Sequence, residues 1–223
     1  MPRVCVFDVN ETLLDLAALD EHFGRIFGDP AVRQAWFGQM IQSALVSIVT
    51  DAYSDFGAIG GAALQMTAER QGVELSDEDR DSILTTVPKL PPHPEVEESL
   101  ARLRDAGIRL AALTNSTQQV AESQMENSGL SVYFEQILSA DTVQRLKPAP
   151  EPYRMAAESL GVEISEIRMV AAHAWDIAGA SRAGCATAFV GRPGKVPDPL
   201  IGKPDIIGAD LSEVTDAIIR EEA

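Results

Sequence analysis

Apolar residues occupy every position from Val4 to Phe7, and the run ends at a carboxylate, Asp8. A short, valine-rich apolar run of this kind is typical of a strand that is buried on both faces of a parallel sheet. Open α/β sheets bind their ligands at the carboxyl ends of the strands. An aspartate at that position can attack an electrophilic carbon or phosphorus and form an ester, although it can equally begin a turn or cap a helix.

The pattern changes over residues 15–91, where apolar residues recur at helical spacing and strand-like runs are few. Gly28-Asp29-Pro30 separates two predicted helices, and longer helices are predicted over 31–49 and 53–71. Ser76 is typical of a helix N-cap, and the proline-rich stretch 88–94 predicts a linker. We expect residues 15–91 to form a helical cap that is inserted after the first strand.

Helices and strands alternate through the rest of the chain. The predicted strands cover 108–113, 136–139, 169–172, 187–190 and 206–207, and the predicted helices cover 94–106, 118–128, 150–160, 177–183 and 212–221. This alternation is typical of right-handed βαβ units, which build a parallel sheet with helices on both faces. The predicted fold class is therefore α/β, with a Rossmann-like core over 1–14 and 92–223 interrupted by the cap.

Polar residues follow four of the predicted strands, and each group also has a purely structural explanation. Thr114-Asn115-Ser116 can be a helix cap, Lys147 a surface residue, and Asp176 the cap of its own helix. The carboxyl ends of parallel strands meet at one edge of a sheet. Four groups at four strand ends therefore favour a single site, which would contain Asp8, Thr12, Thr114, Asn115, Lys147, Tyr153, His173, Trp175 and Asp176.

In their order along the chain these segments resemble the four motifs of the haloacid dehalogenase superfamily. Phe7-Asp8-Val9-Asn10-Glu11-Thr12-Leu13 resembles motif I, and Thr114, Lys147 and Asp176 match the motif II Ser/Thr, the motif III Lys and the motif IV Asp. Leu113-Thr114-Asn115-Ser116, the Lys-Pro-x-Pro-x-x-Tyr spacing from Lys147 to Tyr153, and Ala174-Trp175-Asp176 are similar to the type II, L-2-haloacid dehalogenase subfamily. The resemblance covers essentially the whole chain.

The resemblance implies that Asp8 displaces halide from a short (S)-2-haloalkanoic acid, a small anionic substrate, through an aspartyl ester that water cleaves to a 2-hydroxy acid. Lys147 would keep Asp8 ionised, and Asp176, alone or with His173, would position or deprotonate the water. The implied catalytic residues are Asp8, Thr12, Thr114, Lys147, Tyr153, His173 and Asp176. The implied substrate-binding residues are Asn10, Phe37, Asn115 and Trp175.

Two positions argue against a metal or other cofactor. The phosphatase branch of the superfamily carries a second Asp two residues after the nucleophile, where this chain has Asn10, and an amide cannot act as a general acid. Magnesium-dependent members place two acidic residues four apart in motif IV, where this chain has Ala172 and Asp176. We therefore expect no metal, and transfer of a phosphoryl group is disfavoured.

The chain also departs from the dehalogenase pattern. The cap arginine that cradles the halide is expected at Phe37, and the nearest arginine is Arg33, one helical turn earlier. His173 stands where the subfamily has Asn, and Glu11 stands where it has Gly. Two alternatives therefore stay open: another hydrolase of the superfamily, such as a weak phosphatase or small-anion esterase, and a non-catalytic protein that binds a small acid.

Charge and cysteine content limit the partners that the protein is expected to bind and the cellular compartment in which it is expected to act. The chain has 34 acidic and 18 basic residues, a formal net charge of −16, which argues against binding nucleic acid or an anionic membrane. No apolar run approaches the ~20 residues that span a bilayer, and no signal-peptide pattern is present. The two cysteines, Cys5 and Cys185, are expected to be buried, so we predict a cytoplasmic protein. The resemblance implies a homodimer formed through the cap.

Overall fold

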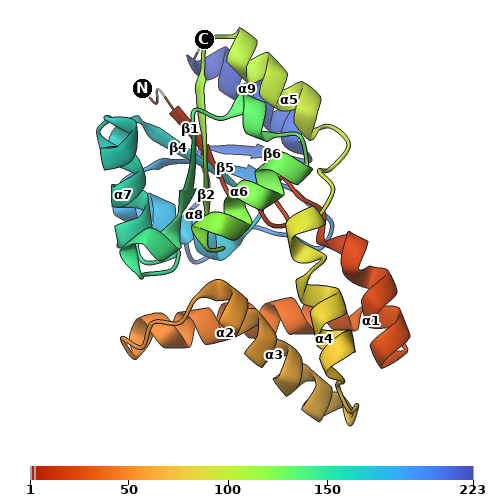
Figure 1. Cartoon of the computed structure of the whole chain (residues 1–223). Helices are drawn as coiled ribbons and strands as arrows, with labels where there is room; N and C mark the ends of the chain where they lie inside the picture. Colours follow the sequence, from red (N-terminus) through yellow and green to blue (C-terminus); the bar gives the residue numbers. More distant parts are fainter. Residues whose placement is uncertain (1, 3, 223) are drawn as a thin grey trace.

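The computed structural model describes residues 2 and 4–222. In this part of the chain, six parallel strands form one sheet in the order β3-β2-β1-β4-β5-β6, which confirms the predicted α/β fold class (Figure 1). Their bounds are β1 (Val4–Phe7), β2 (Arg109–Thr114), β3 (Gln136–Ser139), β4 (Ile167–Ala171), β5 (Ala186–Val190) and β6 (Ile206–Gly208). β1 lies in the middle of the sheet between β2 and β4, so Asp8 leaves the sheet at its centre.

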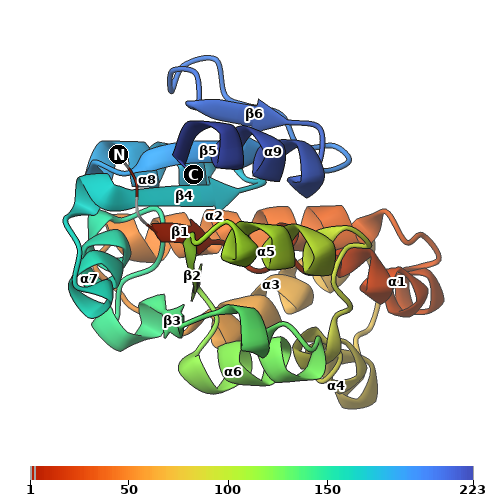
Figure 2. The same cartoon turned by 90° about the horizontal axis from the view of Figure 1, so that it is seen from above.

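The unbroken apolar run of β1 follows from burial on both faces of the sheet. Cys5 and Phe7 pack into the core beneath α5 (Val96–Asp105), α6 (Gln118–Asn127) and α9 (Leu211–Glu222). Val4 and Val6 pack on the opposite face against α7 (Pro150–Leu160) and α8 (Ala174–Ala183). Helices on both faces, seen in Figure 2, leave the carboxyl ends of the strands as the accessible edge of the core.

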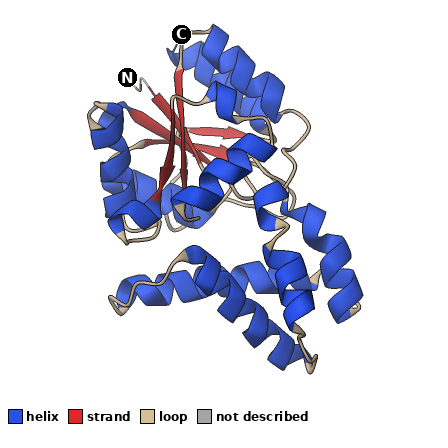
Figure 3. Cartoon of the chain, viewed as in Figure 1, coloured by secondary structure: helices blue, strands red, loops and turns tan. Residues whose placement is uncertain are grey.

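The remaining helices, α1 (Asp20–Phe27), α2 (Val32–Val49), α3 (Phe56–Gln71) and α4 (Asp77–Leu84), lie between β1 and α5 in the chain. Figure 3 shows them as a purely helical layer beside the strand-containing part. The Ser76 side chain accepts a hydrogen bond from the Asp79 amide at 3.1 Å, which confirms the predicted N-cap of α4. Division of the chain at residues 14/15 and 91/92 remains a prediction. None of the described helices is long and apolar enough to cross a membrane.

Short 3₁₀ helices connect the main elements: η1 (Leu16–Leu19), η2 (Val87–Lys89), η3 (Ser131–Tyr133), η4 (Ala140–Val143) and η5 (Ile164–Glu166). One of them, η2, lies at the start of the predicted proline-rich linker. The sequence placed the start of α8 at residue 177, which is wrong by three residues. The amides of Asp176 and Ile177 both bond to the carbonyl of His173, so the chain enters the helix immediately after that residue.

Candidate active site

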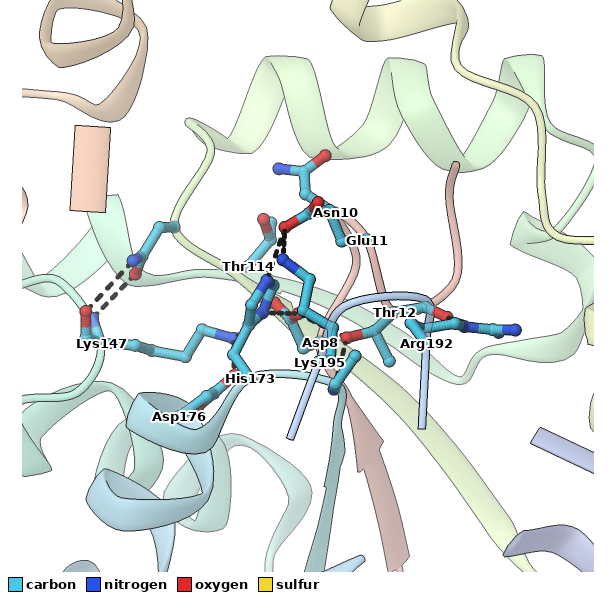
Figure 4. A network of polar contacts seen from close by, with 12 residues as sticks. Asp8, Asn10, Glu11, Thr12, Thr114, Lys147, His173, Asp176, Arg192 and Lys195 are labelled. Atoms are coloured by element: carbon cyan, nitrogen blue, oxygen red, sulfur yellow. Dashed lines mark hydrogen bonds and ion pairs between the residues drawn. The ribbon is translucent and has the colours of Figure 1, made fainter. Parts of the chain in front are cut away.

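Asp8 lies at the carboxyl end of β1 with its side chain almost fully buried. Lys147 donates from Nζ to Oδ1 of Asp8 at 2.9 Å, and Thr12 donates from Oγ1 to Oδ2 at 2.7 Å (Figure 4). Burial favours the protonated acid, but the charge of Lys147 and the hydrogen bonds with His173 and Thr12 together hold the pKa of Asp8 well below its ordinary value. Asp8 is therefore a carboxylate, the form that attacks carbon.

Lys147 is fully buried between two carboxylates. Its Nζ also donates to Oδ2 of Asp176 at 2.7 Å and to the carbonyl of Leu113 at 2.8 Å. Tyr153 donates from its hydroxyl to Oδ1 of Asp176 at 2.6 Å, so both oxygens of that carboxylate are occupied. Burial disfavours a charged lysine, yet the two carboxylates raise the pKa of Lys147, which therefore stays protonated.

The loop that carries Lys147 is fixed to the end of β2. The Lys147 amide donates to Oδ1 of Asn115 at 2.7 Å, and Nδ2 of Asn115 donates to the Lys147 carbonyl at 3.2 Å. The hydroxyl of the neighbouring Thr114 accepts from the Ser116 amide at 3.2 Å. The Asn115 amide therefore uses its oxygen and one of its two N–H groups to position Lys147.

The ring of His173, which follows β4, joins two carboxylates. Nδ1 lies 3.2 Å from Oδ2 of Asp8, and Nε2 lies 2.9 Å from Oε2 of Glu11. Phe37 and Trp175 stack on the imidazole, with ring-centroid distances of 5.6 and 5.1 Å. Burial opposes protonation, but the hydrogen bonds to the two carboxylates raise the pKa of His173 above its ordinary value.

Glu11 is held in place by two cations from different parts of the chain. Lys195 donates from Nζ to Oε2, and Arg33 places Nη1 3.7 Å from Oε1. Burial disfavours the charged form of Glu11, yet contacts with His173 and Lys195 lower its pKa. Glu11 adopts a φ of 61°, in the left-handed region that favours glycine, at a cost of about 1–3 kcal/mol for another residue.

A small cavity of about 10 Å³ opens onto Asp8. The residues that line it are Asp8, Asn10, Phe37, Ile41, Phe56, Thr114, Asn115, His173 and Trp175. The Asn10 amide is turned toward β2 and α6, because Nδ2 contacts the Ser116 hydroxyl at 3.4 Å and Oδ1 accepts from Gln124 at 2.8 Å. Among these lining residues, His173 is the one that can carry a positive charge.

The structure gathers the predicted residues into one region but places them at different depths. Asp8, Asn10, Phe37, Thr114, Asn115, His173 and Trp175 line the cavity. Lys147 lies beneath Asp8, and Asp176 and Tyr153 lie behind Lys147. Arg33 does not take the place of a halide-binding arginine at the cavity, since it bonds to Asp20 and approaches Glu11. The catalytic and binding roles of these residues stay predictions.

Sequence reasoning missed three charged residues of the network. It noted Glu11 only as a replacement for glycine, and it gave no role to Lys195 or Arg192. Arg192 donates from Nη2 and Nε to the carbonyl of Thr12 at 2.8 and 3.2 Å, which fixes the motif I loop. The sequence did contain one signal for Glu11. A glutamate at a position where the family has glycine pays a conformational cost, and such a cost suggests a function. Among the described residues, no group of three or more His, Cys, Asp or Glu is arranged to hold a metal ion.

Comparison with known sequences identifies the family. A sequence model of haloacid dehalogenase-like hydrolases matches residues 2–184. The chain is 30% identical to an (S)-2-haloacid dehalogenase of Pseudomonas sp. (strain YL) over 204 residues, which is 89% of this chain and 87% of that protein. It is 28% identical to (S)-2-haloacid dehalogenase 4A of Burkholderia cepacia over 198 residues, 88% of this chain and 86% of that one. The chain therefore belongs to the haloacid dehalogenase-like hydrolases, as its motifs predicted.

Solved structures share the complete fold. One L-2-haloacid dehalogenase aligns with a TM-score of 0.93 at 26% identity, covering 97% of this chain and 98% of that chain. The L-2-haloacid dehalogenase of Xanthobacter autotrophicus aligns with a TM-score of 0.92 at 23% identity and full coverage of both chains. The helical layer and the parallel sheet thus recur together in these proteins.

Proposed function

We propose that this protein is an (S)-2-haloacid dehalogenase that hydrolyses the carbon–halogen bond of a 2-haloalkanoic acid. The observation that carries the proposal is the ionised Asp8 carboxylate, which faces a small cavity lined by both apolar and polar side chains and is held by Lys147 and Thr12. A carboxylate of this kind is a nucleophile toward an alkyl halide, and a halide needs no proton to leave. The related (S)-2-haloacid dehalogenases support this chemistry over other reactions of the family.

In the first step an Asp8 oxygen attacks the carbon that bears the halogen. The new C–O bond forms as the C–X bond breaks, and halide leaves with the bonding electron pair. Protonated His173 contacts Asp8 through Nδ1 and therefore lies on the side of the attacking oxygen, whereas in-line displacement sends the halide to the opposite side. His173 thus does not take the place of the cap arginine that the family pattern expects at Phe37.

In the second step water cleaves the aspartyl ester with the help of His173. Ester formation removes the negative charge of Asp8, which lowers the pKa of His173 and releases a proton, the one that the overall reaction liberates. Neutral His173 then takes a proton from water while the water oxygen attacks Cγ of Asp8. The ester C–O bond breaks, and His173 returns the proton to the departing 2-hydroxy acid. Asp8 is left as the carboxylic acid and passes its proton to Nδ1 of His173, which restores the starting state.

Glu11 is a positioning residue in this scheme. Its carboxylate holds Nε2–H of His173, which leaves Nδ1 directed at Asp8 as the proton acceptor. Asp176 is less suited to contact the water, because Lys147 and Tyr153 occupy both of its oxygens and it is fully buried behind them. We assign Asp176 to holding Lys147 in place.

The test is halide release from (S)-2-chloropropionate, its R enantiomer and chloroacetate, with a chelator present. We expect equal amounts of halide and 2-hydroxy acid from the S enantiomer, and none from Asp8→Asn. The matched control is Asp29→Asn, which changes an exposed aspartate whose Oδ1 accepts from the Ala31 amide at 2.8 Å. Absence of halide release from every acid, with hydrolysis of a phosphate ester in Mg²⁺, would overturn the proposal.

We further propose that the protein forms a homodimer in the cytoplasm. Val46 and Val49 on α2 are 54% and 85% exposed, and exposed apolar side chains on a helix favour a protein interface. The low cysteine usage supports a reducing compartment. Light scattering of the wild type and of a Val46→Lys/Val49→Glu variant tests the dimer: the wild type should have twice the mass of the chain, and the variant should be monomeric.

A further inference from the structure

A second cavity, of about 230 Å³, adjoins the one at Asp8. Asn10, Phe37 and Phe56 line both cavities and so form the boundary between them. Beyond this boundary the larger cavity is bordered by α2, α3, the segment from α4 to the linker, and the start of α6. Its apolar walls include Leu16, Trp36, Met40, Leu84, Leu90 and Val120.

The two cavities differ in size and chemistry, and together they can hold the two ends of one substrate molecule. The space at Asp8 is about 10 Å³, enough for about one water molecule, so a substrate that reaches Asp8 must also occupy adjoining space. The adjoining cavity is mostly hydrocarbon, and an apolar cavity of about 150 Å³ in another protein holds a benzene molecule. A substituent of similar bulk on the reacting carbon would therefore find room beyond Phe56.

Small residues keep this adjoining cavity open. Asn10 is short, and its amide is drawn toward Ser116 and Gln124. Gly60 in α3 has no side chain, and a Cβ there would meet the flexible end of Met40, with Cε at 3.1 Å. The backbone of Gly60 is itself fixed, since its carbonyl accepts from Nε1 of Trp36 at 3.0 Å. The shape of the cavity is thus set by residue choice on α3.

We infer that the adjoining cavity binds the apolar substituent on C2 of the substrate, so that the preferred substrates are 2-haloacids with a longer alkyl chain or a phenyl-bearing side chain. The inference rests on the proposed dehalogenase function. Each methylene transferred from water into an apolar site contributes about 0.8 kcal/mol, which is roughly four-fold in kcat/KM. The advantage should continue along the chain until the cavity is filled.

The experiment compares kcat/KM for (S)-2-chloropropionate and (S)-2-chlorohexanoate in variants that alter the cavity. Gly60→Leu should reduce the hexanoate-to-propionate ratio at least ten-fold while leaving propionate turnover within about two-fold. Met40→Ala should enlarge the cavity and so raise kcat/KM for 2-chloro-3-phenylpropionate relative to kcat/KM for (S)-2-chloropropionate. The control is Gly61→Leu, a neighbouring α3 glycine that does not line the cavity, with Leu84 Cδ1 at 3.9 Å from a built Cβ.

A second arm measures binding without turnover, so that failure of the inference differs from failure of the proposed function. Hexanoate should bind the wild type at least ten-fold more tightly than propionate by calorimetry, and Gly60→Leu should remove the difference. Selective hexanoate binding without halide release from any acid would overturn the function and retain the cavity assignment. Equal effects of Gly60→Leu on both substrates, or equal binding of both acids, would identify the cavity as an entry path and overturn the inference.

Discussion

At the scale of single residues, the site is a chain of alternating charges. Each member of this chain contacts the next through a hydrogen bond or ion pair, in the order Asp176, Lys147, Asp8, His173, Glu11 and Lys195. Buried charges are stable only when paired in this way, and removing one member leaves its neighbour uncompensated. The order also couples His173 to the charge of Asp8, which disappears when the ester forms. This coupling makes the two chemical steps separable by mutation.

His173→Phe should accumulate the covalent ester. The phenyl ring fills similar space but cannot take a proton from water, so alkylation of Asp8 continues while hydrolysis slows by about 10²–10⁴-fold. Intact-mass spectrometry after mixing with (S)-2-chloropropionate should show one carboxyethyl group per chain, accompanied by a burst of one halide. The matched control, His22→Phe, changes a histidine in α1 that contacts Thr86 at 3.3 Å and should show neither. Steady turnover of His173→Phe at the wild-type rate without an adduct would contradict the role of His173.

Glu11→Gln should shift the acidic limb of the kcat profile to lower pH. When hydrolysis limits kcat, activity falls as pH drops through the pKa of His173, because the protonated ring cannot act as a base. Asp8 and Glu11 contact this ring, and Lys147, Lys195 and Arg33 lie behind them. Losing the charge of Glu11 lowers the pKa of His173, so the acidic limb of the kcat profile moves to lower pH. An unchanged limb, or one shifted to higher pH, would exclude this coupling.

At the scale of elements, local patterns predicted most of the fold. β3 and α7 lie where the sequence placed them, since their ends carry clear signals such as Pro150 at the start of α7 and Gly161 after it. The N-cap at Ser76 could also be predicted from the residue type. The start of α8 could not be predicted in this way, because the turn at His173 depends on backbone hydrogen bonds rather than on residue type.

The candidate site was predictable only where residues belong to motifs. Asp8 and Thr114 stand at the carboxyl ends of β1 and β2, and Lys147 and Asp176 follow β3 and β4, so the parallel sheet brings these residues to one edge. The contact between Glu11 and His173 joins positions far apart in the chain and needs a particular loop conformation with positive φ at Glu11. Such pairing depends on three-dimensional geometry, which no short pattern encodes.

Ser76→Ala should weaken the cap layer without altering chemistry. The Ser76 hydroxyl accepts from the Asp79 amide and begins α4, and loss of such a cap costs about 1 kcal/mol. Thermal unfolding should shift down by roughly 2–4 °C for a chain of this size. The kcat for (S)-2-chloropropionate should be unchanged. Ser76→Thr, which keeps a hydroxyl that can accept from the Asp79 amide and donate to the Asp79 carboxylate, should unfold close to the wild-type temperature, and a fall equal to that of Ser76→Ala would argue against capping as the cause.

At the scale of the whole molecule, the helical layer is anchored to the segment that carries Lys147. Arg145 donates to Asp51 at 2.6 Å, and Tyr53 donates its hydroxyl to Asp141. Both contacts join the loop between α2 and α3 to residues just before Lys147. Phe37 and Phe56 on these helices close the cavity at Asp8. Placement of the helical layer therefore determines the shape of the space in which the reaction occurs.

The net charge of −16 should make catalysis sensitive to salt. An anionic substrate meets a repulsive average field, which ions screen over about 10 Å at 0.1 M ionic strength. Raising ionic strength with sodium sulfate, which adds no halide, should increase kcat/KM by a few-fold and leave kcat constant. A fall in kcat/KM would show instead that local cations attract the substrate over long distances.

The central claim is that Asp8 forms an ester with the substrate, and a single turnover in H₂¹⁸O tests it most directly. With enzyme in excess over (S)-2-chloropropionate, water attacks Cγ of Asp8, so the label should enter the Asp8 carboxylate. The 2-hydroxy acid should then contain the unlabelled oxygen that Asp8 donated. Label in the 2-hydroxy acid after one turnover, with none in the peptide that contains Asp8, would mean direct attack by water and would contradict the account.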